Sequence, residues 1–464
     1  MTLIIVLLLI FGYLLIATGH LTGVSKAAIA MFICTAGWVV YICWGSDFVM
    51  SQHPQEYAEF LSGRQPSSDA VKFFIYNQVF LNYVGRAASI VMFLLATMTI
   101  IEILNNNGCF DFITEWIRTR NSKRLLWTIT LATFILSANL DNLTTATMML
   151  LIMHNIVRNR RQRMLIGAAI VIAANCGGCF TVIGDPTGLL LWGDGAVTAT
   201  NFSKFVGLPA LVAWVVPTLL INRQLPDRLD TEWAAPPYRG DDTNLNRWQR
   251  MVMLVVGIGG LWFIPTFHNI TKLSPFLGAL CVLSVLWVVN EAFNRKLNDA
   301  DQMAQRRIPR AIQYGSIQQM LFVMGIMLAM GVMVETGVMG DISSWIDDNI
   351  HNVWAVGVIS GVLSSLIDTF TIAITDITLY SIDGNSVQVG EYFQHFQPNG
   401  IYWKIIAYCT AVGGCLLSVG STSGLALMKM EHVHLGWYLK NLTPKVLIGF
   451  VLGLLVLYME TYIF

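Results

Sequence analysis

The chain has 464 residues, of which 55% are hydrophobic and only 12% are charged. An ordinary soluble domain carries about 25% charged residues, so this composition excludes that class. The formal net charge is zero, with 28 basic and 28 acidic residues, and therefore neither a nucleic-acid partner nor an acidic tail is indicated.

Apolar runs long enough to cross a bilayer, about 20 residues, recur along the whole chain. The first has no basic segment before it and no small-residue cleavage site after it, so we interpret it as a retained span. Full-length spans are predicted at residues 2–19, 26–45, 86–105, 203–221, 251–267, 275–293, 316–336 and 445–463. Two longer runs, 163–193 and 402–430, contain glycine-rich cores and are predicted to be broken helices. Together these segments give ten crossings.

The apolar run 125–156 is interrupted halfway by the sequence SANLDNLT, and each half alone is too short to cross. Both flanks are basic, and positive charge marks the cytoplasmic side of a membrane. The segment is therefore predicted to be a re-entrant hairpin that enters and leaves on that side, with Asp141 near its tip. The basic residues are Arg118, Arg120, Lys123 and Arg124 before the run, and Arg158, Arg160, Arg161 and Arg163 after it.

A second run of the same kind, residues 353–379, breaks at SSLIDTFT. Its flanks lack Lys and Arg, so this hairpin is predicted to open to the outside. With five crossings per half, the second half is inserted upside down relative to the first. The predicted division is residues 1–221, a cytoplasmic linker at 222–250, and residues 251–464, with both termini outside. The first linker and the segment 295–310 carry the remaining basic residues of the cytoplasmic side.

The two halves share an internal repeat. Gly177-Gly178-Cys179 recurs as Gly413-Gly414-Cys415, 236 residues later, and Gly184 and Gly188-Leu189 recur at the same spacings. Upstream, three residues coincide between the hairpins: Ser137 with Ser364, Asp141 with Asp368 and Thr144 with Thr371. Repeats with polar, glycine-broken cores at mid-membrane are typical of secondary transporters. The predicted fold is an all-α polytopic membrane protein made of two inverted repeats, each with five spans and a re-entrant hairpin.

Carboxylates at membrane depth are costly and are usually buried, paired or functional. Asp141 stands among Asn139, Asn142 and Thr144, which are hard oxygen ligands at a helix break, where unwound backbone also frees carbonyl oxygens. Such a site suits a dehydrated alkali cation, and it equally suits a proton. One aspartate can then hold either ion but not both, and that competition is sufficient for an antiporter.

Asp185 is the second candidate, because Pro186 after it forces a helix break. Its repeat-mate is Ser421, so the halves are chemically unequal. Among these residues, Asp141, Asp185 and Asp368 are the predicted Na⁺ ligands. The full predicted ion- and proton-binding set is Asp141, Asn142, Thr144, Asp185, Thr187, Asp368, Thr369, Thr371 and Ser421. The predicted supporting set is Ser137, Asn139, Asn175, Gly177, Gly178, Asp376, Gly413 and Gly414.

Structural roles remain open for part of these sets. Glycines at such spacings are often helix-packing contacts, and serines in membrane helices usually bond to their own backbone. Cys176 and Cys179 form a CxxC pair, but no second pair or nearby histidine accompanies them, so a metal site is disfavoured. Most cysteines are expected to be reduced and buried.

At SANLDNLTTATMM, AANCGGCFTVIGDPTG and GGCLLSVGSTSGLALM the chain resembles NhaD-type sodium/proton antiporters, which belong to a superfamily that includes arsenite permeases and divalent-anion symporters. The resemblance implies a bacterial inner-membrane protein that exports Na⁺ or Li⁺ for protons, with a scaffold domain, a moving transport domain and usually a dimeric state. It places Asp141, Asn142, Thr144, Asp185 and Asp368 at the family's ion site. Two departures, Thr369 in place of an expected asparagine and Pro186 after the aspartate, bear on selectivity and stoichiometry.

Three other functions are weighed against antiport. A dicarboxylate or arsenite carrier of the same fold favours neutral hairpin tips and cationic partners, whereas here each tip bears an aspartate and no Lys or Arg is expected near them. An intramembrane aspartyl protease is suggested by Gly184-Asp185, but its motif expects glycine where Val182 stands. A uniport channel would not need duplicated hairpins. We therefore expect a transporter and not an enzyme, with no cofactor besides the transported ions, and with the lipid bilayer as its surroundings.

Overall fold

The computed structural model describes residues 2–62, 65–117, 119–229, 245–293, 314–382 and 391–463. Within these residues, nine helices are long and apolar enough to cross a membrane, judged by length and composition. Eight of them coincide with the predicted full-length spans. These are α1 (Thr2–Thr22), α2 (Lys26–Cys43), α6 (Leu81–Asn106), α12 (Ala199–Asn222), the helix built from α13 (Arg247–Leu254), η2 (Val255–Gly259) and α14 (Gly260–Thr271), α15 (Pro275–Phe293), α18 (Tyr314–Glu335) and α25 (Thr443–Ile463). The ninth is α10 (Arg160–Phe180), the first part of a predicted broken helix.

Some predicted features lie outside the described residues. They are Arg118, residues 230–244 of the predicted linker, and the predicted basic segment 295–310.

Both predicted hairpins consist of two short helices joined by a break. The first pairs α8 (Ser122–Ser137) with α9 (Asn142–Ile156), and the second pairs α20 (Val353–Leu366) with α21 (Thr369–Leu379). The longest of the four has 16 residues, which is about 24 Å at 1.5 Å per residue. A hydrocarbon core is roughly 30 Å thick, so no single arm can cross it.

The two predicted broken helices are also interrupted where the glycines cluster. One consists of α10 and α11 (Pro186–Gly193), and the other of α22 (Ile401–Gly413) and α23 (Thr422–Glu431). A helix start leaves four backbone N–H groups without partners, which is costly where water is scarce. In all four half-helices that follow a break, a side-chain oxygen accepts from these groups. The caps are Asp141 for α9, Asp185 for α11, Asp368 for α21 and Ser421 for α23.

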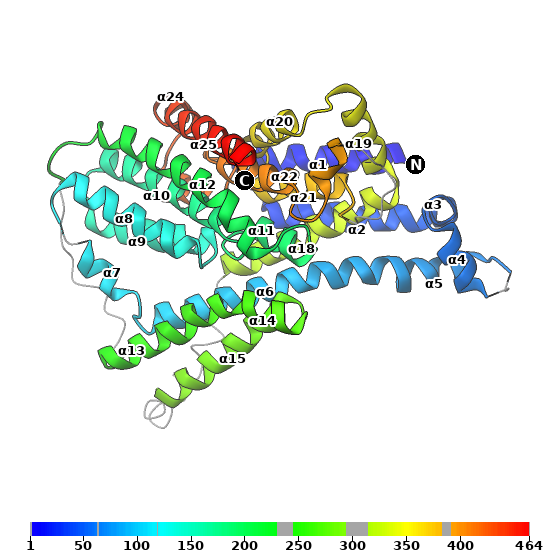
Figure 1. The fold of residues 1–464 in the computed structure, drawn as a ribbon, viewed down its shortest axis with the longest axis horizontal. Coiled ribbons are helices and arrows are strands. Elements are labelled where there is room, and N and C mark those ends of the chain that lie inside the picture. The colour runs from blue at the N-terminus through cyan, green and yellow to red at the C-terminus, as the bar shows by residue number, and fades with distance from the viewer. Residues whose placement is uncertain are drawn as a thin grey trace.

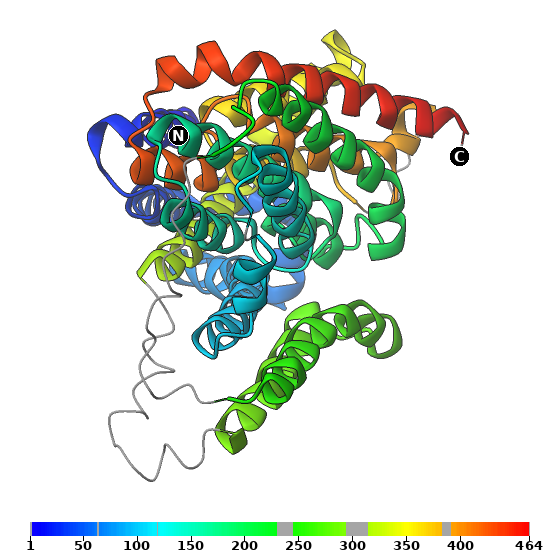
Figure 2. The same ribbon diagram turned by 90° about the vertical axis from the view of Figure 1, so that its left-hand side faces the viewer.

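Helix packing in the first half recurs in the second. α8 and α12 pack on α10, and α20 and α25 pack on α22 in the same way. The halves interlock, because α9 packs on α23, α21 packs on α11, and α12 packs along α25. The unit α13–α15 packs on α6 at one edge of the molecule, where α14 also meets α11 through the rings of His268 and Trp192 (Figures 1 and 2). The opposite orientation of the halves across a membrane stays a prediction.

The repeated serines and glycines make equivalent contacts in both halves. Ser137 Oγ donates to the Ala174 carbonyl at 2.5 Å, and Ser364 Oγ donates to the Thr410 carbonyl at 2.6 Å. A Cβ atom at Gly184 would lie 2.6 Å from the Ser137 carbonyl oxygen, and one at Gly420 would lie 2.5 Å from that of Ser364. These glycines therefore let the backbone of each hairpin touch the break of its own broken helix.

A polar segment between α2 and α6 folds into the short helices α3 (Gly45–Gln52) and α4 (Pro54–Leu61). The following helix starts earlier than the sequence predicts, because α5 (Ser68–Phe74) and the π-helical η1 (Ile75–Phe80) continue directly into α6. Hydropathy alone did not predict this early start, because the first residues of the helix are polar.

The segment is anchored to the end of α18 through a buried carboxylate. Glu335 accepts from Tyr83 Oη at 2.8 Å and from Tyr41 Oη at 3.3 Å, and it lies 2.7 Å from His53 Nε2. The other ring nitrogen of His53 lies 2.8 Å from Glu56. The hydrogen bond to Glu335 raises the pKa of His53 above its usual 6.5, against an opposing effect of burial.

The His53 contact predicts a pH-dependent attachment of residues 45–61. A histidine with a raised folded-state pKa stabilises the fold fully below the unfolded pKa, and that contribution is lost as pH rises through the folded pKa. Amide exchange of residues 45–61, corrected for intrinsic rates, should therefore be faster at pH 9 than at pH 6. His53→Gln should remove this difference, whereas the exposed control His434→Gln should keep it. Equal protection at both pH values in the wild-type protein would contradict the prediction.

Candidate functional site

Asp141 is held at the break of the first hairpin by local and distant donors. Its Oδ2 accepts from the Thr144 backbone N–H at 3.1 Å and from the Thr144 hydroxyl at 3.2 Å. Its Oδ1 accepts from Gln319 Nε2 at 3.2 Å, across from α18. The side chain is only 3% exposed, so the carboxylate is removed from bulk water.

Asp185 lies beside this hairpin at the start of α11. Its Oδ2 accepts from the Thr187 backbone N–H at 3.1 Å, and its Oδ1 accepts from Asn142 Nδ2 at 2.9 Å. The same amide of Asn142 also donates to Asn175 Oδ1 at 3.3 Å. The structure therefore joins the tip of the first hairpin directly to the break of the first broken helix.

The second broken helix reaches the same cluster through serines. Ser423 Oγ donates to Asn175 Oδ1 at 3.1 Å and lies 3.2 Å from Ser421 Oγ. Asn175 Nδ2 in turn donates to Cys415 Sγ at 3.0 Å. Residues from four separate segments thus form one continuous polar cluster.

Asp368 repeats the local geometry of Asp141. Its Oδ2 accepts from the backbone N–H groups of Phe370 and Thr371 at 3.1 and 3.2 Å, and from the Thr371 hydroxyl at 3.3 Å. Its Oδ1, however, forms an ion pair of 2.9 Å with Lys26 Nζ. The expectation that no Lys or Arg lies near the hairpin tips is therefore wrong for the second hairpin. Lys26 was hidden because it begins α2 in a distant part of the chain.

Asp141 and Asp185 differ from Asp368 in this respect. Neither forms an ion pair with any residue that the structure describes. Burying an uncompensated charge costs several kcal/mol, so these two carboxylates require a proton or a cation.

Several of the remaining predicted residues connect a hairpin to its broken helix. Thr369 donates its backbone N–H to the Gly420 carbonyl at 3.0 Å, which ties the second hairpin to its broken helix. A Cβ at Gly178 would lie 3.2 Å from Asn142 Cβ. A Cβ at Gly177 would meet the backbone of Phe134. In the second half, a Cβ at Gly413 would meet the backbone of Gly361, and a Cβ at Gly414 would meet the side chain of Thr369. All four glycines therefore serve close packing between hairpin and broken helix.

Two predicted supporting residues form no hydrogen bond to the cluster among the described residues. Asn139 donates back to the Ile135 carbonyl of its own helix at 2.8 Å. Asp376 lies two turns along α21 from Asp368, where its backbone carbonyl accepts from Tyr402 Oη at 2.9 Å. Its buried Oδ2 accepts no hydrogen bond from the described residues.

Sequence reasoning missed Gln319 and Lys26, whereas for Ser423 it left a ligand role and a structural role open. Gln319 follows Gln318 inside an otherwise apolar helix, and that pair of amides is a signal that could have been weighed. Lys26 stands at the first position of a span, where basic residues are commonplace, so its role had no comparable signal.

A cavity of about 640 Å³ leads to the donors of both hairpin aspartates. Its lining near the two aspartates includes Lys26, Leu143, Gln319 and Thr422. Its lining near the end of α23 includes Lys429. His432 and His434 also line it, and the His432 carbonyl accepts from Arg160 at 2.9 Å. An ion entering from this cavity would meet Lys26 or Gln319 before either aspartate.

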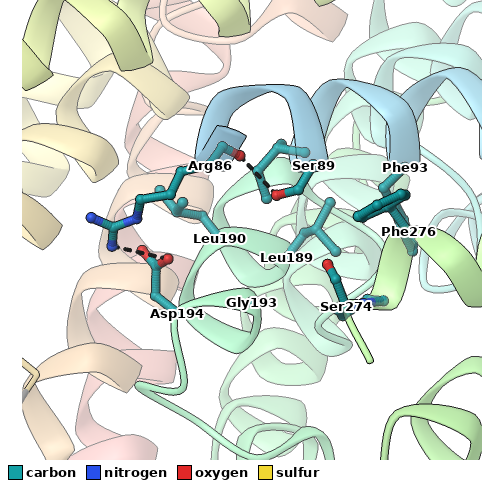
Figure 3. Close-up of a pocket in the computed structure, with 11 residues that line it drawn as sticks. Arg86, Ser89, Phe93, Leu189, Leu190, Gly193, Asp194, Ser274 and Phe276 are labelled. Carbon is teal, nitrogen blue, oxygen red and sulfur yellow. Dashed lines mark hydrogen bonds and ion pairs between the residues drawn. The ribbon is translucent and has the colours of Figure 1, made fainter. Parts of the chain in front are cut away.

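A smaller cavity of about 100 Å³ lies at the end of α11, between α6 and the start of α15. There Arg86 and Asp194 point toward each other, and their ion pair of 3.1 Å joins α6 to α11 (Figure 3). The two half-helices that begin in the site thus end at different cavities, a wide one beside α23 and a narrow one beside α11.

Cys176 and Cys179 are buried free thiols. No group of three or more His, Cys, Asp or Glu side chains suited to a metal ion occurs among the described residues.

The model of a family described as citrate transporter matches residues 1–381. The chain belongs to the citrate transporter family. Among its relatives is "Sodium/proton antiporter 1" of Arabidopsis thaliana, 32% identical over 80% of this chain and 61% of that protein. "Sodium/proton antiporter 2" of the same plant is 29% identical over 96% of both chains. The "Na(+)/H(+) antiporter NhaD" of Vibrio cholerae is 27% identical over 79% of this chain and 77% of that protein.

These matches confirm the resemblance to NhaD-type antiporters. The Alcanivorax borkumensis YdaH transporter has a related fold, with a TM-score of 0.56 and 13% sequence identity, over 91% of this chain and 98% of that chain. This member of the citrate transporter family is therefore a multi-pass membrane protein of the ion transporter fold. Its relatives are transporters, which agrees with the expectation that it is not an enzyme.

Proposed function

We propose that this protein is an antiporter that exchanges cytoplasmic Na⁺ or Li⁺ for external protons. The observation that carries the proposal is the pair of buried carboxylates, Asp141 and Asp185, which have no ionic partner among the described residues. Asn142, the residue after Asp141, links the hairpin tip to Asp185 by donating to its carboxylate. Oxygen ligands and net negative charge suit a hard monovalent cation. Relatives whose names state sodium/proton antiport support the same assignment.

Exchange follows from competition at these oxygens. A cation compensates negative charge of the two carboxylates in one step, and protons on the carboxylates replace it in the other, so the site is never both empty and fully ionised in the membrane interior. Gln319 suits this role, because its Oε1 accepts no hydrogen bond from the described residues while its Nε2 contacts Asp141. Turning the amide over would exchange a donor to Asp141 for an oxygen ligand to the cation.

Alternating access requires that the site communicate with one side at a time. His432, which lines the wide cavity, accepts a hydrogen bond from Arg160 at the start of α10. Arg160 belongs to the basic flank of the first hairpin, which predicts the cytoplasmic side. We therefore assign this conformation as open to the cytoplasm, with the Arg86–Asp194 ion pair at the closed outer end. We further propose a bacterial inner-membrane location, external termini and a homodimer.

An anion carrier is the second candidate, and one observation favours it. The wide cavity is lined by Lys26, Lys429, His432 and His434, which would attract a carboxylate substrate, and the family model carries the name citrate transporter. Against it stand Asp141 and Asp185, because two anionic side chains at the end of that cavity repel an anion.

Transport by everted membrane vesicles that hold a pH gradient decides between the two candidates. Added Na⁺ or Li⁺ should release protons in vesicles containing the protein, whereas choline should not. Radioactive citrate should not accumulate in a protein-dependent manner. Vesicles that respond to Na⁺ no differently from vesicles lacking the protein would refute antiport, and protein-dependent citrate uptake would favour the second candidate.

A further inference from the structure

The two hairpin aspartates have the same local bonds but different long-range partners. Thr144 and Thr371 serve Asp141 and Asp368 in the same way, through a backbone N–H and a hydroxyl. The remaining oxygen faces a neutral amide in one case and an ammonium in the other. Gln319 Nε2 lies 3.2 Å from Asp141 Oδ1, and Lys26 Nζ lies 2.9 Å from Asp368 Oδ1.

An ammonium at this distance from a carboxylate occupies the place that a bound alkali cation would need. Asp368 is 1% exposed and Lys26 is 13% exposed, so the pair is largely shielded from water and from screening by salt. Removing one partner of such a pair leaves a buried charge and costs roughly 3–5 kcal/mol. A Na⁺ ion that bound at Asp368 would first have to displace the lysine.

The polar residues around Asp141 and Asp368 also differ between the two halves. In the first half, Asp141 is followed by Asn142, whose amide donates to the side-chain oxygens of Asn175 and Asp185. In the second half, the equivalent positions are Thr369, Ala411 and Ser421. At these positions the second half therefore lacks a second carboxylate and both amides, and the carboxylate at its hairpin tip is already neutralised.

We propose that Lys26 is a tethered cation that fills the alkali-cation place at Asp368, so that only the half containing Asp141 and Asp185 binds a transported ion. Lys26 thereby sets the number of cations bound per chain. The inference rests on the proposed cation transport and removes Asp368 from the predicted Na⁺ ligands. Because Lys26 also lines the wide cavity, it is the group that excludes an entering cation from the second hairpin.

Equilibrium binding of radioactive sodium to purified protein at alkaline pH tests this assignment. Wild-type protein and Lys26→Arg should bind one Na⁺ per chain, because both carry a cation beside Asp368. Lys26→Met keeps the length of the side chain but removes its charge, and it should bind two. Lys26→Met combined with Asp368→Asn should return to one, because the added place is removed with its carboxylate.

Thermal unfolding at increasing Na⁺ concentration gives a second test, which also applies if Lys26→Met is destabilised by the loss of the lysine charge. Its thermal unfolding temperature should rise more steeply with Na⁺ than that of the wild-type protein, because an additional bound ion stabilises the fold by mass action. The double variant should lose this extra dependence. An effect on packing alone would not depend on Na⁺ and would persist in the double variant.

Two different failures are distinguishable. One Na⁺ per chain in Lys26→Met, with the Na⁺ dependence of unfolding unchanged, would overturn the role of Lys26 and leave antiport standing. A folded wild-type protein that binds no Na⁺ would instead overturn the proposed function.

Discussion

Replacing Asp141 by asparagine is expected to abolish Na⁺-dependent proton release. Asparagine still accepts the Thr144 backbone N–H, so the cap of α9 is kept. The negative charge that compensates the dehydration of the cation is lost. Losing one partner of a buried charge pair costs roughly 3–5 kcal/mol, and each 1.4 kcal/mol is about tenfold in affinity. We therefore expect a loss of at least about a hundredfold in Na⁺ affinity, measured by proton release in everted vesicles.

The matched control is Asp69→Asn, the same chemical change at an exposed aspartate in the first turn of α5. It should leave exchange at the wild-type level. Protein amounts are compared in the same vesicles, so that a loss of activity is separated from a loss of protein. Exchange by Asp141→Asn at the wild-type rate would remove this carboxylate from the mechanism.

Alanine at Gly184 or at Gly420 is expected to destabilise the protein and reduce exchange. The new Cβ would stand 2.6 Å from the Ser137 carbonyl oxygen in the first case and 2.5 Å from that of Ser364 in the second. Both neighbours are backbone atoms, so neither can turn away as a side chain would. Overpacking of this kind costs about 1–3 kcal/mol. A lower thermal unfolding temperature in detergent should report the effect in both variants.

Gly85→Ala is the matched control for this pair. Gly85 lies within α6, and nothing stands within 4 Å of its added Cβ. Alanine favours a helix interior over glycine by about 0.5–1 kcal/mol, so this variant should unfold at the wild-type temperature or above it. If alanine at Gly184 and Gly420 were tolerated as well as at Gly85, close contact between hairpin and break would not explain the repeated glycines.

Much of the fold could be predicted because the relevant signals are local. Hydrophobic length predicts the spans, since crossing a bilayer requires a fixed number of apolar residues. The hairpin breaks are readable at Asp141 and Asp368, where a polar residue that caps a new helix stands inside an apolar run. The early start of the helix leading into α6 was missed, since hydropathy does not register a polar helical extension.

The partners of the aspartates could not be predicted in the same way. Gln319 and Lys26 are far from Asp141 and Asp368 in sequence, and each sits on a helix from the other half of the chain. A lone amide or lysine on such a helix has many ordinary explanations. Only the tertiary contacts of α2 with the second hairpin and of α18 with the first give these two side chains their roles.

The sequence by itself determined the segments: spans by their apolar length, breaks by their glycines and capping oxygens, and the relation of the halves by their repeated residues. Tertiary structure alone decided which aspartates lack a countercharge, because that depends on which helix of the opposite half delivers its polar group to each break. Charge balance in a dehydrated interior is a property of three-dimensional neighbours, and residues adjacent in the chain do not reveal it.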